Sequence, residues 1–256
     1  MTLLFLLEKL LKWLFVASLA GFAVAWWQRD TLPEPDFYDS RISQAPRQDE
    51  TDRPEFDVDV GAQRYRIKPL YAYELDGMVV SMSHADSIAD IYHAEWQDYL
   101  NLKDICVIWG DNVSSAVYQD MDFANTTWTC WASWPNGAVR QRFSDQSLSN
   151  NHLLADRPEV QQVVLQARPG DQVRFGGYLA EYRNPANGFF RGTSTSRQDR
   201  GNGACETVYV ERFEIVRQAN RGWRRLFSIS RWLAPLSLIG VIALMLITPV
   251  RRNVHR

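Results

Sequence analysis

One polar stretch, residues 191–206, contains most of the residue types in this chain that could do chemistry. It reads RGTSTSRQDRGNGACE and brings hydroxyls, arginines, acids and a cysteine together. Gly201 and Gly203 leave the backbone free to adopt positive φ angles, and the arginines suit an anionic group. A long surface connection between two strands has a similar composition. The stretch therefore predicts either a functional loop or a plain connection.

A thiol-dependent reaction is one hypothesis for this stretch. Cys205 would be the nucleophile, His152 the base, and Asp199 or Asn151 the group that orients the base. Such chemistry needs a thiolate beside an imidazole that a third group holds in place. The sequence supplies these residue types, but no spacing forces them together, and the flanks differ from known thiol-protease signatures. In the alternative interpretation His152 caps a turn and Cys205 packs in the core.

Ligand binding by polar side chains is the other hypothesis. Two further polar strings, WGDN at 109–112 and SNNH at 149–152, accompany the stretch at 191–206. The candidate ligand-binding residues are Asp111, Asn112, Asn151, Arg191, Arg197, Asn202 and Glu206. We expect no metal and no cofactor, because the sequence has no CxxC, HExxH or GxxxxGK[ST] pattern, and its GNG lacks the strand-to-helix context of a nucleotide loop.

The three cysteines of the chain are Cys106, Cys130 and Cys205. In an oxidising compartment one pair could be bridged, and three pairings are open. We expect a disulfide between Cys130 and Cys205. Three buried thiols fit the sequence as well, and they would suit a cytosolic domain.

Apolar segments at both ends predict membrane-spanning helices. Residues 232–250 contain no charge and, at about 1.5 Å per residue, cover roughly 28 Å, close to the thickness of the hydrocarbon core. Residues 13–29 predict another span with tryptophans at both borders, after an interfacial lead-in at 1–12. A cleaved signal peptide is the alternative, but a small-residue cleavage site is missing. The second span is flanked by basic segments at 217–231 and 251–256.

Between these segments the composition predicts a linker and then one domain. Residues 30–64 are rich in proline and acids, which is typical of a linker, and residues 65–216 have the size of a domain. The residue patterns predict strands at 71–82, 105–109, 128–134, 171–182 and 207–216, and helices at 88–100 and 156–167. We expect an α+β fold: a small curved β-sheet or a partly open OB-like barrel with two short helices, flanked by two transmembrane helices.

Five strings resemble those of a group of uncharacterised bacterial proteins with membrane anchors. They lie within residues 65–216 and read YELDGMVVS, ICVIWGDN, SNNHLL, GDQVRFGGYLAEY and RGTSTSRQDRGNGACETVYVERFEI. The resemblance implies a bacterial envelope protein. It implies no activity, substrate or catalytic residue.

Charge limits the classes of partner. Residues 30–214 carry 29 acids against 17 basic residues, which excludes nucleic acid because phosphates need a basic surface. Lys9 and Lys12 precede the first span and favour a cytoplasmic N-terminus, although the positive-inside rule is nearly balanced over the chain. We expect a two-pass protein of the bacterial inner membrane with a periplasmic central domain. A cytoplasmic domain within a membrane complex is the alternative.

The sequence thus predicts a membrane-anchored interaction module rather than an enzyme. Its expected partners are the lipid bilayer and a protein in the membrane, within an envelope complex. The alternative is a membrane-tethered cysteine hydrolase or transferase that uses Cys205 and His152.

Overall fold

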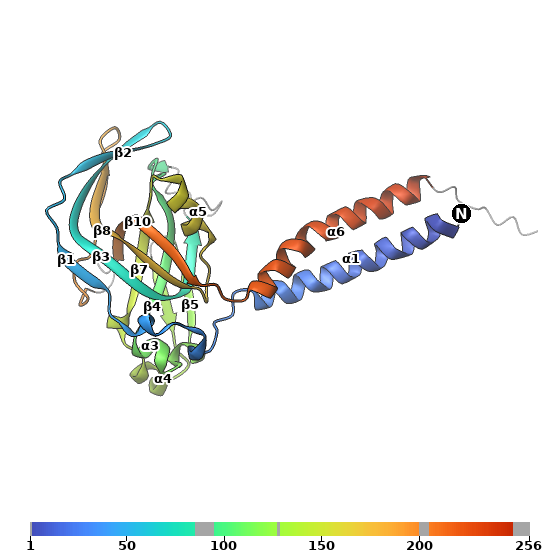
Figure 1. Cartoon of the computed structure of the whole chain (residues 1–256), viewed down its shortest axis with the longest axis horizontal. Helices are drawn as coiled ribbons and strands as arrows, with labels where there is room; N and C mark the ends of the chain where they lie inside the picture. Colours follow the sequence, from blue (N-terminus) through green and yellow to red (C-terminus); the bar gives the residue numbers. More distant parts are fainter. Residues whose placement is uncertain (1, 85–94, 127–128, 200–204, 248–256) are drawn as a thin grey trace, which may run out of the picture. The chain divides into compact units, whose positions relative to one another are not determined.

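The computed structural model describes residues 2–84, 95–126, 129–199 and 205–247. The chain forms two compact units, one made of both terminal segments and the other of Leu32–Ala219 (Figure 1). The second unit is α+β, as expected, with a large mixed sheet.

The terminal unit contains two long antiparallel helices, α1 (Thr2–Gln28) and α6 (Arg221–Ile247). Gly21 of α1 faces Ser230 of α6, since a Cβ atom at Gly21 would lie 3.0 Å from the Ser230 Oγ. Of the described residues, one helix, α6, is long and apolar enough to cross a membrane. One of the two expected spans therefore has a matching candidate, and the other expected span falls within α1.

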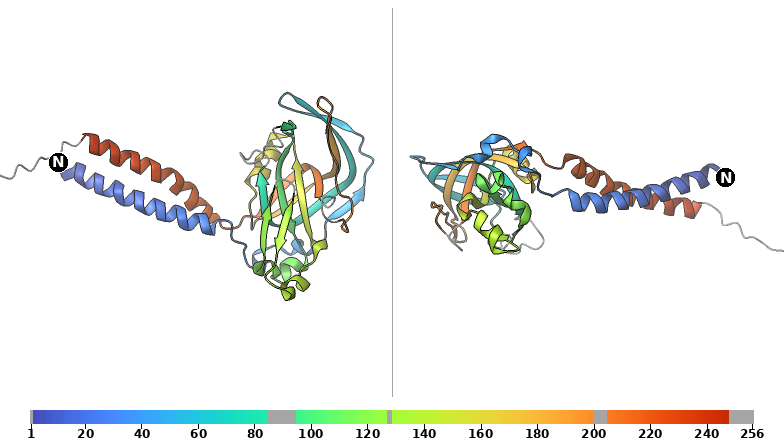
Figure 2. Two further views of the ribbon diagram at one scale, coloured as in Figure 1. Left: turned by 180° about the vertical axis from the view of Figure 1, so that it is seen from behind. Right: turned by 90° about the horizontal axis from the view of Figure 1, so that it is seen from below.

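Five strands of the large sheet form a closed ring (Figures 1 and 2). In pairing order they are β3 (Gln63–His84), β4 (Asn101–Ile108), β7 (Leu148–Leu154), β10 (Cys205–Arg217) and β8 (Gln172–Asn184). The ring closes because β8 also pairs with β3. All of these pairings are antiparallel except that of β7 with β10, which is parallel.

Shorter elements surround this ring. Strands β1 (Arg47–Glu50) and β2 (Phe56–Val60) pair with β3, and β9 (Phe189–Arg191) pairs with β8. A separate two-stranded sheet consists of β5 (Asp122–Asn125) and β6 (Cys130–Ser133). The short helices are α3 (Asp111–Ser114), α4 (Gly137–Arg142) and α5 (Pro158–Gln166), and 3-10 turns occupy Pro35–Phe37, Ser40–Ser43, Val117–Asp120 and Asp145–Ser147.

Residues 32–64 of the expected linker belong to the second compact unit. This segment supplies β1 and β2, and its side chains Tyr38 and Ile42 are buried in the main core. Some of its acids pair with arginines of β3, as Asp57 does with Arg66, where Oδ1 and Nε are 2.8 Å apart. Backbone pairing and charge pairing with β3 therefore hold a segment that has few apolar residues of its own.

The expected strands are all present, and one of the two helices is confirmed. Helix α5 matches the predicted helix at 156–167 and begins at Pro158. The carboxylate of Asp156 accepts a hydrogen bond from the Tyr209 hydroxyl at 2.7 Å. The other predicted helix, at 88–100, falls largely on residues 85–94, which lie outside the described residues. Residues 248–256, the end of the second span and the basic tail, lie outside them too.

The two faces of β7 and β10 bury different clusters. Side chains alternate between the faces of a strand. On β10, Val208 and Val210 belong to the main core, whereas Tyr209 between them belongs to a second cluster, with Leu154 of β7. We call the first the inner face and the second the outer face.

Candidate functional site

Two of the three polar strings, SNNH at 149–152 and the stretch at 191–206, meet where β7 and β10 run in parallel. Cys205 pairs with Asn150, Glu206 with Asn151, and Thr207 with His152. The alternation of side chains places the candidates on opposite faces. On the outer face lie Asn150, His152 and Cys205; on the inner face lie Ser149, Asn151 and Glu206.

The outer face holds a group of three residues: the buried Asp104 and His152 and the half-buried Arg191. Nδ1 of His152 lies 2.6 Å from Oδ1 of Asp104, and Nε2 lies 2.7 Å from Nη2 of Arg191. Because a guanidinium donates and never accepts, Nε2 must accept this hydrogen bond, so we assign the imidazole proton to Nδ1. Burial opposes ionisation of Asp104, but His152 and Arg191 outweigh it and hold its pKa below the ordinary value.

This arrangement does not suit a cysteine-dependent reaction. Nε2 of His152 is occupied by Arg191, and the Cys205 Sγ accepts a hydrogen bond from the Asn150 side chain at 3.4 Å. Burial raises the pKa of Cys205, which disfavours the thiolate that a nucleophile needs. Asp199 does not orient His152; it accepts a hydrogen bond from the Ser194 hydroxyl at 2.7 Å.

The inner face holds a second buried group, centred on Glu206. Its Oε1 lies 2.7 Å from Nη1 of Arg197, and its Oε2 accepts a hydrogen bond from the Ser149 hydroxyl at 2.9 Å. Arg197 also donates to the Tyr73 hydroxyl at 2.8 Å, and its guanidinium lies over the Trp109 ring. Burial raises the pKa of Glu206 despite the neighbouring Arg197.

The remaining ligand-binding candidates do not join these two groups. Asn151 is buried, and its Nδ2 donates to the Ser149 carbonyl at 3.3 Å. The Asn112 side chain accepts a hydrogen bond from the backbone N–H of Ser144 at 2.8 Å. Asp111 is exposed, and Asn202 lies outside the described residues.

The disulfide joins Cys106 to Cys130, so the expected pairing of Cys130 with Cys205 is wrong. The Cα atoms of Cys106 and Cys130 are 5.7 Å apart. Cys130 lies on β6, and the bridge attaches the β5–β6 hairpin to β4. Cys205 is instead placed against Asn150 by the parallel pairing of β10 with β7, which local sequence does not reveal.

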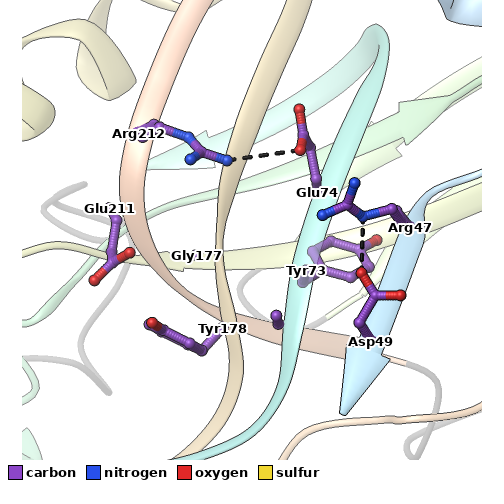
Figure 3. Close-up of a pocket in the computed structure, with 9 residues that line it drawn as sticks. Arg47, Asp49, Tyr73, Glu74, Gly177, Tyr178, Glu211 and Arg212 are labelled. Carbon is purple, nitrogen blue, oxygen red and sulfur yellow. Dashed lines mark ion pairs between the residues drawn. The ribbon is translucent and has the colours of Figure 1, made fainter. Parts of the chain in front are cut away.

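A surface cavity of about 200 Å³ lies over the paired strands β1, β3, β8 and β10 (Figure 3). Its floor includes Gly177, where a Cβ atom would lie 2.0 Å from the Tyr209 carbonyl oxygen, so only glycine permits this approach of β8 to β10. Four of the five charged residues in its lining form pairs: Glu74 with Arg212 at 3.6 Å, and Arg47 with Asp49 at 2.8 Å. We attribute this hollow to the closure of the ring.

Sequence reasoning missed two residues that complete the buried groups. Asp104 pairs directly with His152 across β4 and β7, and Tyr73 reaches Arg197 from β3. The one available signal was an acid at the start of an apolar strand, in NLKDICVI. Within the described ranges, no cluster of three His, Cys, Asp or Glu side chains could hold a metal ion.

Comparison with known proteins assigns this chain to no family. No protein-family model, curated protein or solved structure matches the chain.

Proposed function

We propose that this protein is a membrane-anchored, non-enzymatic interaction module that binds a partner protein through residues 192–199. The observation that carries this proposal is that Arg191 contacts His152 on the outer face of the ring, whereas Arg197 pairs with Glu206 on the inner face. These two half-buried arginines, each held by a buried residue, restrict the conformation of the segment without a template from a partner. A rigidly held loop on a stable scaffold is a common form of binding site.

The partner surface is the exposed part of this segment. Thr195, Ser196 and Gln198 are exposed, while Ser194 is buried and bonded to Asp199. Backbone contacts add to the order, since the Ser194 N–H donates to the Cys205 carbonyl at 2.9 Å. The segment thus presents short polar side chains on a fixed backbone. Because it is already ordered, a partner that binds it loses little conformational entropy.

The ring supports assignment to the OB-type barrels. In chain order its strands are β3, β4, β7, β8 and β10. Helix α5 lies between the third and fourth of these strands, and the third strand, β7, pairs in parallel with the fifth, β10. OB folds are five-stranded Greek-key barrels that bind ligands with the loop between strands four and five, among others. The segment 192–204 is part of that connection here. This is an argument from fold and not from relatives.

Two-pass anchoring is part of the proposal. At about 1.5 Å per residue, α1 extends roughly 40 Å, enough to cross the hydrocarbon core. It packs along α6 through small and aromatic residues: Phe22 lies 4.9 Å from the Phe227 ring, and Gly240 faces Leu11. Small residues at a helix contact are typical of packing in membranes. The other apolar side chains of both helices are largely exposed, as contact with lipid requires.

A periplasmic domain in a bacterial inner membrane is supported by the disulfide of Cys106 with Cys130, because disulfides persist in oxidising compartments. Labelling of intact cells tests which side of the membrane the domain faces. In a Cys205→Ser background, we expect Gln198→Cys to react with a membrane-impermeant maleimide, and Thr2→Cys to react only after lysis. The reverse pattern would place the domain in the cytoplasm and overturn this part of the proposal.

Site-specific photo-crosslinking tests the partner surface. A photoreactive amino acid replaces Gln198 in the segment or, as the matched control, Gln162 on the exposed side of α5. We expect position 198 to give one discrete crosslinked species in intact membranes and position 162 to give none. Equal crosslinking at both positions, or none at either, would contradict a partner surface at 192–199.

The cysteine hydrolase or transferase has no geometric support of this kind. Cys205 and His152 each have other partners, Asn150 for the thiol and Arg191 for the imidazole Nε2. A reactive thiol at Cys205 towards an electrophilic probe at neutral pH would reopen that hypothesis.

A further inference from the structure

A second cavity, of about 360 Å³, lies beside Trp96, where the residues before β4 meet the turn between β8 and β9. Its lining consists of Glu95, Trp96, Asn187, Gly188, Phe189 and Phe190. Small-molecule pockets have this size and this character, mainly aromatic with few polar groups. We propose that this cavity binds an organic ammonium ion, with a quaternary ammonium group such as that of choline as the best fit.

Two of the three aromatic rings of the cavity, those of Trp96 and Phe189, pack against other rings. The Trp96 ring lies 5.8 Å from the Phe189 ring, which in turn lies 5.4 Å from the ring of the buried Tyr182. Trp96 nevertheless remains 39% exposed and Phe190 61% exposed. Large aromatic faces are thus presented to solvent on a fixed support. Such faces attract cations through the ring quadrupole, and tryptophan does so best.

The polar groups of the cavity favour a cation over a neutral polar ligand. The Asn187 amide is already used: its Nδ2 donates to the Trp96 carbonyl at 2.7 Å, and its Oδ1 accepts the Phe189 N–H at 3.0 Å. Glu95 is the one charged residue in the lining, it is exposed, and it forms no ion pair within the described residues. A sugar would find few hydrogen-bonding groups here, whereas an ammonium ion would find a carboxylate and aromatic faces.

Basic residues near Phe190 do not oppose this charge preference. Three of them line a neighbouring hollow that Phe190 also borders. Each is paired with an acid: Arg66 with Asp57 at 2.8 Å, Lys68 with Glu181 at 3.0 Å, and Arg183 with Glu55 at 3.7 Å. The acidic balance of residues 30–214 adds a long-range attraction for cations.

The test compares choline with 3,3-dimethyl-1-butanol, its neutral isostere in which carbon replaces the charged nitrogen. Both are titrated against the full chain in dodecyl maltoside, a detergent without an ammonium group, by calorimetry or saturation-transfer NMR. We expect saturable binding of choline and about tenfold or more weaker binding of the isostere. Equal affinities, or no saturable binding of choline, would overturn the proposal.

Variants locate the site. Glu95→Gln, Trp96→Ala and Phe190→Ala should each weaken choline binding by about five- to tenfold. Glu50→Gln makes the same chemical change at an exposed acid outside the cavity and should bind choline normally. If Trp96→Ala disturbs folding, which circular dichroism would show, the Glu95 and Phe190 variants carry the test. Normal choline binding by Glu95→Gln would sink the idea.

Nanodiscs distinguish two sources of the ammonium group. Loss of choline binding in phosphatidylcholine, with binding retained in phosphatidylglycerol, assigns the cavity to a lipid headgroup. Equal choline binding in both bilayers assigns it to a soluble ligand. Either result supports the ammonium class and names its source, and neither depends on the partner surface at 192–199.

Discussion

His152 lies directly opposite Asp104 in the antiparallel pairing of β7 with β4, with Nδ1 and Oδ1 2.6 Å apart. Both side chains are buried, and Arg191 occupies the other imidazole nitrogen. An acid that orients a histidine is also found in hydrolases, where the other imidazole nitrogen accepts the proton of the nucleophile. Here the guanidinium of Arg191 occupies that nitrogen instead. The same geometry that resembles part of a catalytic site therefore ties β9 to the ring.

Asp104→Asn should destabilise the domain by about 3–5 kcal/mol, because it removes a buried negative charge that interacts with both His152 and Arg191. The pKa of Asp104 is lowered in the folded state. Its contribution is therefore present above its ordinary pKa in the unfolded chain and is lost as the pH falls through the lowered value. Thermal and urea unfolding across acid pH would measure both effects. Asp111→Asn, at an exposed acid, should change stability by less than about 0.5 kcal/mol.

Glu206 should make the free energy of unfolding depend on pH in the direction opposite to that of Asp104. Because its pKa is raised by burial, the folded state binds more protons than the unfolded state between the ordinary and the raised pKa. The free energy of unfolding should therefore fall as the pH rises through this window, by up to about 1.4 kcal/mol per pH unit. In Glu206→Gln this component should vanish, since an amide does not titrate there. Identical pH profiles for the two proteins would refute the assignment.

The disulfide predicts a distinct pattern of thiol reactivity. After unfolding without reductant, one thiol per chain, that of Cys205, should react with a maleimide polymer, and after reduction three should react. Cys130→Ser should cost about 3 kcal/mol of stability and leave two reactive thiols before reduction. Cys205→Ser should leave the bridge intact. Loss of the bridge in Cys205→Ser would restore the pairing of Cys130 with Cys205.

Lys103 provides a further test, at the C-terminal end of α5. It is fully buried, and its Nζ donates to the carbonyl oxygens of Val164, Leu165 and Ala167 at 3.3, 3.0 and 2.7 Å. A cation there stabilises the negative end of the helix. Lys103→Met should cost about 2–3 kcal/mol because buried carbonyls lose a donor. Lys68→Met removes an exposed lysine and should cost below about 1 kcal/mol in the same unfolding assay.

Several parts of the fold follow from local sequence. Strand β8 was predictable because Val173, Phe175 and Leu179 follow the two-residue period of one strand face, and all three are buried in the main core. Helix α5 was predictable because Pro158 begins a helical repeat of apolar residues that Pro169 and Gly170 end. The apolar run in α6 is a composition signal that needs no tertiary information.

The segment 30–64 was mispredicted because composition reports what a segment can bury by itself. Its backbone pairs with β3, and acids such as Asp57 and Asp59 find arginines there. Pairing between strands is a non-local property, so an acidic and proline-rich string can still be part of a sheet.

The candidate site also has a part that the sequence predicts and a part that only the tertiary structure shows. The sequence by itself determined that polar and charged residues gather at 149–152 and 191–206, and that an apolar helix follows the domain. Only the tertiary structure decided that Arg191 meets His152 while Arg197 meets Glu206, and that Cys106 bonds Cys130. The physical reason is strand register: a shift of one residue sends every side chain to the opposite face, and ring closure fixes that register through contacts distant in sequence.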